Sequence, residues 1–545
     1  MMKNQIASLG LTLIAAWMGM ASAEEISPAA PTSAAVESTH DIILPAPVTS
    51  GDVVLPAIPA IAPRTPVPAP PNTEGLDNSR IIRVPYLTET VKKEIRDQIR
   101  AELRADVLQD VLTQAKDQRW GVPGVLPEWI DRIRVKGDMR VRAQSEFYDR
   151  DNAPFGYYDY VTINRSGGGL AFINAQEERH RLRERVRLGV DARVNNEIKA
   201  VMQLSTGSLA DPVSTNQTLG NTGQRSTVGF DLAYLQIDDE DADHYPWLTM
   251  QLGRMKNPWL GTDLVWDADL AFDGLAATYR KNLRGSDSLM EMSDRDRTLF
   301  VTVGAFPIQE VALSQRDKWL FGAQVGSEFI FTSQSKLTFG LAYYDYVHIA
   351  GKMNDSQNSS NLLQTNTDYT APDFMQKGNT LFDIRDDTSE RWALASDYNL
   401  VDFTLVYDLA RFAPYHLVMT GDYVRNIGYK TNEIRRRTND ATTNEIKARN
   451  KGYQAQLAFG WPLVMERGTW RVSYAYKYLE RDAVLDAFTD SDFHLGGTDA
   501  KGWILSGEYG LYENTWLTAR WITADAIDGP PLGVDVLQLD FNVRF

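Results

Sequence analysis

The 545-residue chain contains no cysteine and only six histidines. The absence of cysteine excludes a disulfide framework, a lipidated cysteine and a cysteine nucleophile. The histidines are scattered, at positions 40, 180, 244, 348, 416 and 494, and no HExxH, GxSxG or P-loop motif occurs. The glycines at 167–169 lack the strand-turn-helix setting that phosphate binding needs. We therefore expect no enzymatic activity, no cofactor and no metal site.

Long apolar runs are also missing after the first 23 residues, which excludes a helical membrane protein. Residues 1–23 have the parts of a secretory signal peptide, with Lys3 before an apolar core and Ala21-Ser22-Ala23 at the cleavage site. The formal net charge of -16 argues against nucleic acid as a partner. An exported chain of this kind can still be a membrane β-barrel, because lipid-facing residues there alternate with polar ones.

The N-terminal part of the mature chain divides into two segments. Residues 24–84 are dominated by Pro, Ala, Val, Ser and Thr, a composition that predicts a disordered periplasmic tether. Within residues 85–120 apolar side chains recur every four positions from Leu87 to Val111, which predicts an amphipathic helix. The spacing is compatible with a coiled coil between copies of the chain and equally with a helix lying on the mouth of a barrel.

The last residues of the chain show strict alternation. Leu537, Leu539, Phe541, Val543 and Phe545 are apolar, whereas the residues between them are polar, so the segment is a strand with one apolar face and one polar face. The same alternation recurs between residues 130 and 545. We expect strands near 132–148, 179–194, 197–207, 228–238, 246–254, 270–281, 297–306, 318–332, 335–349, 401–411, 415–427, 449–461, 468–481, 500–511, 515–525 and 534–545.

These sixteen strands are joined alternately by long and short connections. The one exception is 282–296, which is long although a short connection is expected at its place in the order. Alternation of long loops with short turns is typical of outer-membrane barrels. A closed sheet leaves no unpaired edge in hydrocarbon. The predicted fold is therefore an all-β membrane protein, a 16-stranded antiparallel transmembrane β-barrel with an N-terminal periplasmic helix.

Basic residues occupy alternate positions of the first two strands and therefore share one face, which we call the basic wall. It consists of Arg134, Lys136, Arg140, Arg142, Arg181, Arg183, Arg185 and Arg187. The intervening residues are mostly apolar, so we expect the basic wall to line the lumen. Like charges on neighbouring strands destabilise a sheet unless water or acids compensate them. The wall either filters ions and solutes or is paired with acids such as Asp138, Asp191 and Asp540 to keep the lumen solvated.

Three motifs carry a resemblance to a known family. They are Pro127-Glu128-Trp129-Ile130-Asp131-Arg132 before the first strand, Gly253-Arg254 followed by Asn257-Pro258, and the terminal Phe545. With them, residues 130–545 resemble the Gram-negative porins, most closely the sixteen-stranded channels grouped as putative porins. The resemblance implies that the connection 255–269 is the constriction loop that folds into the barrel. It also implies that Phe545 is the signal read by the barrel assembly machinery.

The constriction loop implied by the resemblance would present Asp263, Asp267 and Asp269 to the basic wall, although it is shorter than the usual loop of that family. Opposed acids and bases in a narrow neck orient polar solutes. The three aspartates could instead bind Ca²⁺, but their spacing does not match an EF-hand, and a solvated loop is the simpler alternative.

The function expected from these features is passive diffusion of small hydrophilic solutes and ions through a water-filled pore in the outer membrane of a Gram-negative bacterium. The N-terminal segment and the C-terminus would be periplasmic. The resemblance implies a homotrimer in contact with outer-membrane lipid and lipopolysaccharide. Two alternatives stay open: a channel specific for small anions such as dicarboxylates or phosphate, and a non-conducting structural or adhesive barrel plugged by loops 350–400 and 427–448.

Overall fold

The computed structural model describes residues 132–241, 245–283, 297–312, 316–331, 335–354, 367–385, 389–438 and 447–545. The predicted signal peptide (1–23), tether (24–84) and helix (85–120) lie outside these ranges.

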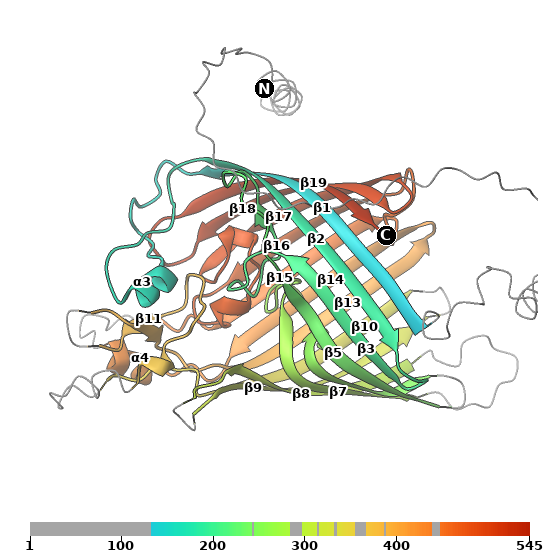
Figure 1. Cartoon of the computed structure of the whole chain (residues 1–545), viewed down its shortest axis with the longest axis horizontal. Coiled ribbons are helices and arrows are strands. Elements are labelled where there is room, and N and C mark those ends of the chain that lie inside the picture. The colour runs from blue at the N-terminus through green and yellow to red at the C-terminus, as the bar shows by residue number, and fades with distance from the viewer. Residues whose placement is uncertain are drawn as a thin grey trace, which may run out of the picture. The chain divides into compact units, whose positions relative to one another are not determined.

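One closed antiparallel sheet makes the wall of the barrel (Figure 1). Its strands are β1 (Ile133–Tyr148), β2 (Arg179–Arg193), β3 (Ile198–Thr206), β5 (Val228–Glu240), β6 (Pro246–Lys256), β7 (Ala271–Asn282), β8 (Arg297–Gln309), β9 (Lys318–Ile330), β10 (Lys336–Val347), β13 (Asn399–Phe412), β14 (Tyr415–Asn426), β15 (Lys451–Gly460), β16 (Trp470–Leu479), β17 (Ala500–Tyr512), β18 (Thr515–Ala526) and β19 (Gly533–Arg544). The sheet counts seventeen strands, and removing the two-residue β4 (Gln217–Thr218) leaves sixteen. The 16-stranded barrel is confirmed, and every predicted strand end lies within three residues of the observed one.

Pairing of the first strand with the last closes the barrel. On one side of β1, Arg142 lies opposite Asp540 of β19, and on the other side it lies opposite Arg183 of β2. Because every strand then has two neighbours, no row of backbone N–H and C=O groups is left unpaired at an edge.

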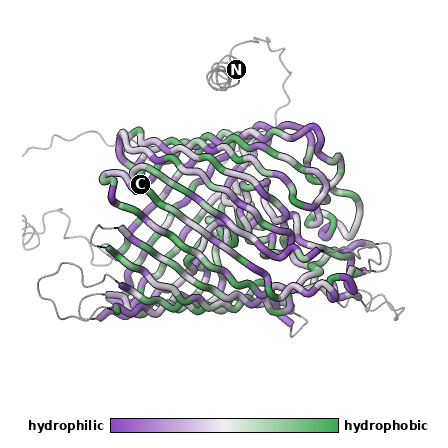
Figure 2. Tube along the Cα trace, turned by 180° about the vertical axis from the view of Figure 1, so that it is seen from behind, coloured by the Kyte–Doolittle hydropathy of each residue, from purple (hydrophilic) through white to green (hydrophobic). Residues whose placement is uncertain are grey.

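Alternation along each strand separates an outer face from a lumen. In β19 the side chains of Leu539 and Phe541 are 42 % and 44 % exposed on the outside, whereas Gln538 and Asp540 are buried within the barrel. The same green and purple alternation runs along most strands in Figure 2. The outer row can therefore face hydrocarbon while the inner row meets water or other polar groups.

The connections differ between the two ends. The helices α3 (Tyr160–Ser166) and α4 (Thr431–Thr438) and the hairpin β11 (Leu381–Asp383) and β12 (Trp392–Leu394) gather at the end opposite the C-terminus (Figure 1). Three short 3-10 turns also belong to long connections: η2 (Asp368–Thr370), η3 (Asp486–Phe488) and η4 (Phe493–Leu495). β7 ends at Asn282 and β8 begins at Arg297, so the connection between them is long although it lies at the end with short turns. No helix in the described ranges is long and apolar enough to cross a membrane.

The largest cluster of buried apolar side chains lies inside the barrel. Trp259, Trp266 and Leu264, which follow β6, pack with Phe306 and Tyr344 of the wall and with Leu485 of the connection before β17. The lumen is therefore partly filled by inward-folded loops. These loops form the candidate site.

Candidate pore constriction

The connection between β6 and β7, residues 257–270, is here called loop L3, and its first part docks on glycines of the wall. Trp259 is only 6 % exposed. Cβ atoms placed on Gly304 of β8 and Gly322 of β9 would lie 3.1 and 2.7 Å from Cζ2 of Trp259, and these two glycines face each other across the ladder. The absence of side chains at these positions creates the recess that receives the indole ring.

Backbone hydrogen bonds fix the next residue of L3 to the same wall. The N–H of Leu260 donates to Oε1 of Gln324 at 2.8 Å, and Nε2 of Gln324 donates back to the Leu260 carbonyl at 2.7 Å. The backbone N–H and C=O of Leu260 are thus both satisfied by one inward-facing side chain. This arrangement holds L3 against β8–β10.

The middle of L3 reaches the opposite side of the barrel. Nζ of Lys477, an inward-facing residue of β16, lies 3.3 Å from Oδ1 of Asp263 and 3.1 Å from Oδ2 of Asp490. β16 stands across the ring of strands from β6. L3 is therefore long enough to span the lumen. Burial opposes ionisation of Asp263, but Lys477 holds the pKa of this carboxyl below its ordinary value.

The end of L3 contacts the basic wall through Asp269. Its Oδ1 forms an ion pair with Arg187 and lies 3.6 Å from Nη1 of Arg185, and its Oδ2 accepts a hydrogen bond of 2.9 Å from Thr215. Burial raises the pKa of Asp269, but Arg187, Arg185 and Arg140 outweigh it, so the pKa lies below the ordinary value. Asp269 is therefore a counter-charge for the arginines of β2.

Asp267 points elsewhere, toward the connection between β16 and β17, residues 480–499, which we call loop L7. Its Oδ2 accepts the N–H of Ser491 at 2.8 Å, and its own N–H donates to the carbonyl of Phe488 at 2.8 Å. Burial, together with the nearby charges of Asp490 and Asp269, raises the pKa of Asp267 to about 8. Asp267 is thus a mainly neutral bridge between the two inward loops at neutral pH.

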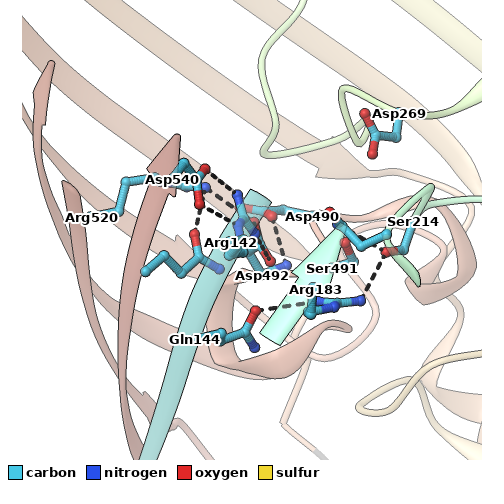
Figure 3. Close-up of polar contacts among 12 residues, drawn as sticks. Arg142, Gln144, Arg183, Ser214, Asp269, Asp490, Ser491, Asp492, Arg520 and Asp540 are labelled. Carbon is cyan, nitrogen blue, oxygen red and sulfur yellow. Dashed lines mark hydrogen bonds and ion pairs between the residues drawn. The ribbon is translucent and has the colours of Figure 1, made fainter. Parts of the chain in front are cut away.

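Loop L7 brings a second acid to the basic wall. Oδ2 of Asp492 lies 3.0 Å from Arg142 of β1 and 3.1 Å from Arg520 of β18, while Nε of Arg142 lies 2.7 Å from Oδ1 of Asp540 (Figure 3). Burial opposes ionisation of Asp492, but Arg142 and Arg520 hold its pKa far below the ordinary value. Arg142 is 1 % exposed, so the centre of this ionic cluster is buried, while Asp492 and Arg520 at its edge stay partly exposed.

Loop L7 is held inside the barrel by the connection between β10 and β13, residues 348–398, called loop L5. Nε2 of Gln376 donates to the carbonyl of Asp486 at 2.8 Å, and Nδ2 of Asn379 donates to the carbonyl of Val484 at 2.9 Å. The N–H of Thr380 donates to Oδ1 of Asp482 at 2.9 Å. The first two bonds satisfy backbone carbonyls of L7, and the third pairs the carboxylate of Asp482 with a backbone N–H of L5.

The remaining residues of the basic wall differ in how well they are compensated. Lys136 pairs with Asp191 at 2.7 Å, Arg181 pairs with Glu146, and Arg185 lies 2.9 Å from Asp138. Arg140 lies 3.9 Å from Asp540.

Two members of the wall, Arg134 and Arg183, contact no carboxylate in the part of the chain that the structure describes. Arg183 reaches only Gln144 at 3.2 Å and Ser214 at 3.4 Å (Figure 3). Pairing with acids and residual positive charge therefore occur side by side on the basic wall.

The three aspartates of L3 do not converge. Asp263 faces Lys477, Asp267 faces Ser491 and Asp269 faces Arg187. Among the described residues no group of three or more His, Cys, Asp or Glu side chains could hold a metal ion.

Phe545 follows β19 at the other end of the barrel, where its backbone N–H and C=O pair with Gly137 at 2.9 and 2.8 Å.

Sequence reasoning missed Asp490 and Asp492, because a long connection between strands does not show by itself that it folds inward, and it missed Lys477 and Arg520, because isolated basic residues on β16 and β18 form no row like that of β2. The composition of L7 held a signal: Ala483-Val484-Leu485, Phe488 and Phe493 are unusually apolar for an exposed loop. Apolar loop residues flanking Asp490 and Asp492 indicate a loop that is buried and carries charge inward.

Comparison with known proteins supplies the family. Residues 23–545 match the family model described as "Putative porin". No curated protein matches the chain significantly.

The chain is similar to solved outer-membrane channels at low sequence identity. The outer membrane channel DcaP of Acinetobacter baumannii is 11 % identical, over 76 % of this chain and 97 % of that chain, with a TM-score of 0.38. OprB of Pseudomonas putida is 11 % identical, over 78 % and 97 %, with a TM-score of 0.43. OmpF of Salmonella typhi in complex with daunomycin is 10 % identical, over 76 % and 97 %, with a TM-score of 0.38. The match of the family model to nearly the whole sequence, together with the closed barrel, shows that the chain belongs to the putative porins and is an outer-membrane channel.

Proposed function

We propose that this porin allows passive diffusion of small hydrophilic solutes and ions, and that its basic wall favours anions. The constriction consists of L3 and L7, which narrow the lumen between β8–β10 and the basic wall. A neck lined by fixed charges in surroundings of low dielectric acts strongly on the sign of a passing ion.

The observation that carries the proposal is the charge balance at the basic wall. Six of its eight basic side chains contact carboxylates, namely Asp138, Glu146, Asp191, Asp269, Asp492 and Asp540. The acids of L3 add no free negative charge, because Asp263 and Asp269 are already paired with Lys477 and Arg187. The positive charge in excess lies at Arg134 and Arg183, and it raises the local concentration of anions.

A second candidate is a channel specific for small oxyanions. In such a channel the guanidinium of Arg183, which has no carboxylate partner among the described residues, would bind the anion directly and not only contribute to the electric field of the lumen. Nε of Arg183 is buried and has no partner, and Gln144 and Ser214 stand beside it. A guanidinium can bind a carboxylate or phosphate through two parallel hydrogen bonds. Saturable anion flux would favour this candidate over a general pore.

The test is the reversal potential of the purified protein in a planar bilayer under a KCl gradient. We expect anion preference, and we expect Arg183→Gln to reduce the chloride-to-potassium permeability ratio about twofold or more. The matched control is Arg425→Gln, which removes the same charge from an exposed residue on the outer face of β14. A cation preference of the unmodified channel, or equal effects of the two variants, would refute the anion filter.

The proposed function also implies an orientation of the barrel in the outer membrane. We propose that the end bearing α3, α4 and loop L5 is extracellular and that the C-terminus at Phe545 is periplasmic, since long loops of outer-membrane barrels face outward. Homotrimer formation, contact with lipopolysaccharide and recognition of Phe545 by the assembly machinery remain predictions, as does the absence of enzymatic activity. Protease accessibility of loop L5 in intact cells tests the orientation.

A further inference from the structure

A cavity of about 310 Å³ opens on the lumen against β15–β18, beside the tip of L3. Its volume is at the lower end of the range of small-molecule sites, roughly 300–1,000 Å³. The lining residues are inward-facing members of four consecutive strands together with one residue of L3. They are Gln454, Gln456, Arg471, Ser473, Ala475, Ile504, Ser506, Glu508, Thr518, Arg520 and Asp263.

The charged groups of this cavity are already paired with one another or with neighbours. Nη2 of Arg471 lies 2.6 Å from Oε2 of Glu508, directly opposite in the ladder. Arg520 is paired with Asp492, and Asp263 with Lys477. The four charges in the lining, two positive and two negative, balance. The binding of an anion is therefore less favourable in this cavity than at Arg183.

Some of the neutral polar groups of the cavity are, by contrast, uncommitted, although Thr518 accepts a hydrogen bond of 3.2 Å from Asn542. The side chains of Gln456, Ser473 and Ser506 make no hydrogen bond to any described part of the chain. Gln454 is 5 % exposed, and its Oε1 is buried without a donor. Ser473 and Ser506 face each other across the ladder, and Ser506 faces Arg520 on its other side. Buried acceptors without donors cost free energy, and a ligand that brings hydroxyl groups can recover it.

From these groups we infer that the cavity is a binding subsite for a neutral polyhydroxylated solute of about monosaccharide size. Hydroxyl groups both donate and accept, as do the side-chain amides and serines that line the cavity, and Gln454 Oε1 requires a donor that a carboxylate ion lacks. Ala475 and Ile504 offer a small apolar floor for the carbon skeleton of such a solute. The inference rests on the proposed function, because the solute reaches the cavity through the lumen.

The probe is D-glucose, added to the full-length protein in a planar bilayer while the ion current through single channels is recorded. We expect glucose to reduce the current saturably. The double variant Ser473→Ala with Ser506→Ala should raise the half-saturating glucose concentration about tenfold, the effect of losing two hydrogen bonds. Gln456→Leu should raise the half-saturating glucose concentration about fivefold. Gln251→Leu is the matched control, because Gln251 is a luminal glutamine of β6 outside the cavity.

The outcomes separate the subsite from the channel. Ion conductance without any saturable effect of glucose, or an equal effect of Gln251→Leu and Gln456→Leu, overturns the subsite and leaves the porin. Block by glycine but not by glucose also overturns it, because the ligand would then be a zwitterion. If no conductance is found, the proposed function fails, and calorimetric titration of the detergent-solubilised protein with glucose decides the subsite independently. Heat that saturates in the unmodified protein and weakens in Gln456→Leu supports it, and absence of heat refutes it.

Discussion

Loop L3 is attached to the barrel in two different ways. On the β8–β10 side, Trp259 packs into a recess made by Gly304 and Gly322, and this main contact is apolar, beside the two hydrogen bonds between Leu260 and Gln324. On the side of β1, β2 and β16, Asp263 and Asp269 are held by Lys477, Arg185 and Arg187, and the contact is ionic. The apolar attachment depends on shape, whereas the ionic one depends on the presence of both partners.

The difference indicates that the two ends of this short loop have different roles. Packing of an indole against glycines fixes position and is insensitive to salt or pH. Ion pairs that bridge the lumen carry the charges that a permeating solute meets, and their strength depends on how deeply they are buried. Variants on each side should therefore differ in what they change: stability and pore geometry on the apolar side, stability and selectivity on the ionic side.

The largest effect is expected at Arg142 of the basic wall, which pairs with Asp492 of L7 and Asp540 of β19 and not with L3. Replacement by Met leaves Asp492 and Asp540 buried with one cationic partner fewer, and removing one member of a buried ion pair costs about 3–5 kcal/mol. We expect Arg142→Met to lower the free energy of unfolding by an amount of this order, measured by urea titration in lipid vesicles.

Arg183→Met is the control for Arg142→Met. Arg183 occupies the directly opposite position on β2 and has no carboxylate partner among the described residues, so its replacement should cost much less. Equal losses in the two variants would show that Asp492 and Asp540 do not determine the stability of the basic wall.

A side chain at Gly322 should disrupt the apolar attachment of L3. A Cβ at this position would lie 2.7 Å from the ring of Trp259, so Gly322→Val must displace the indole and with it the start of L3. Overpacking of this kind costs about 1–3 kcal/mol. We expect lower stability and an altered single-channel conductance, with the anion preference retained because the arginines stay in place.

Gly421→Val serves as the comparison for Gly322→Val. Gly421 is also a strand glycine, but no atom lies within 4 Å of its Cβ position, so the added side chain meets open space. A change in conductance of the same size in Gly421→Val would mean that the recess under Trp259 does not position L3.

The fold could be predicted from the sequence because alternation is local. The row Arg181, Arg183, Arg185 and Arg187 fixes which face of β2 is polar, and strand bounds follow wherever such alternation stops. Closure of the sheet then requires only that β1 meet β19, as the strand number and the alternation of long and short connections implied. None of this depends on which side chain contacts which across the lumen.

The partners within the lumen could not be predicted in the same way. Asp263 and Lys477 are 214 residues apart, and their contact depends on the reach of L3 across the barrel. Asp492 reaches Arg142 only because L5 holds L7 inside. Such contacts come from tertiary packing of loops, for which the sequence has no period to read.

The contact between L3 and L7 should respond to pH through Asp267, the smallest effect expected here. Its pKa of about 8 lies above that of an ordinary carboxyl, so the neutral form is favoured by the fold and the stabilisation is lost as pH rises through about 8. Above that value the charge of Asp267 meets Asp490 and Asp269, which are themselves partly compensated by Lys477, Arg185 and Arg187. We expect the noise of the single-channel current to rise as pH approaches about 8 and to level off above it, because the closed contact loses about 1.4 kcal/mol per pH unit only while it keeps a proton that the open form has released. Asp267→Asn keeps a neutral acceptor for Ser491 and should abolish this pH dependence, whereas a channel whose noise rises equally in both proteins would place the titrating group elsewhere.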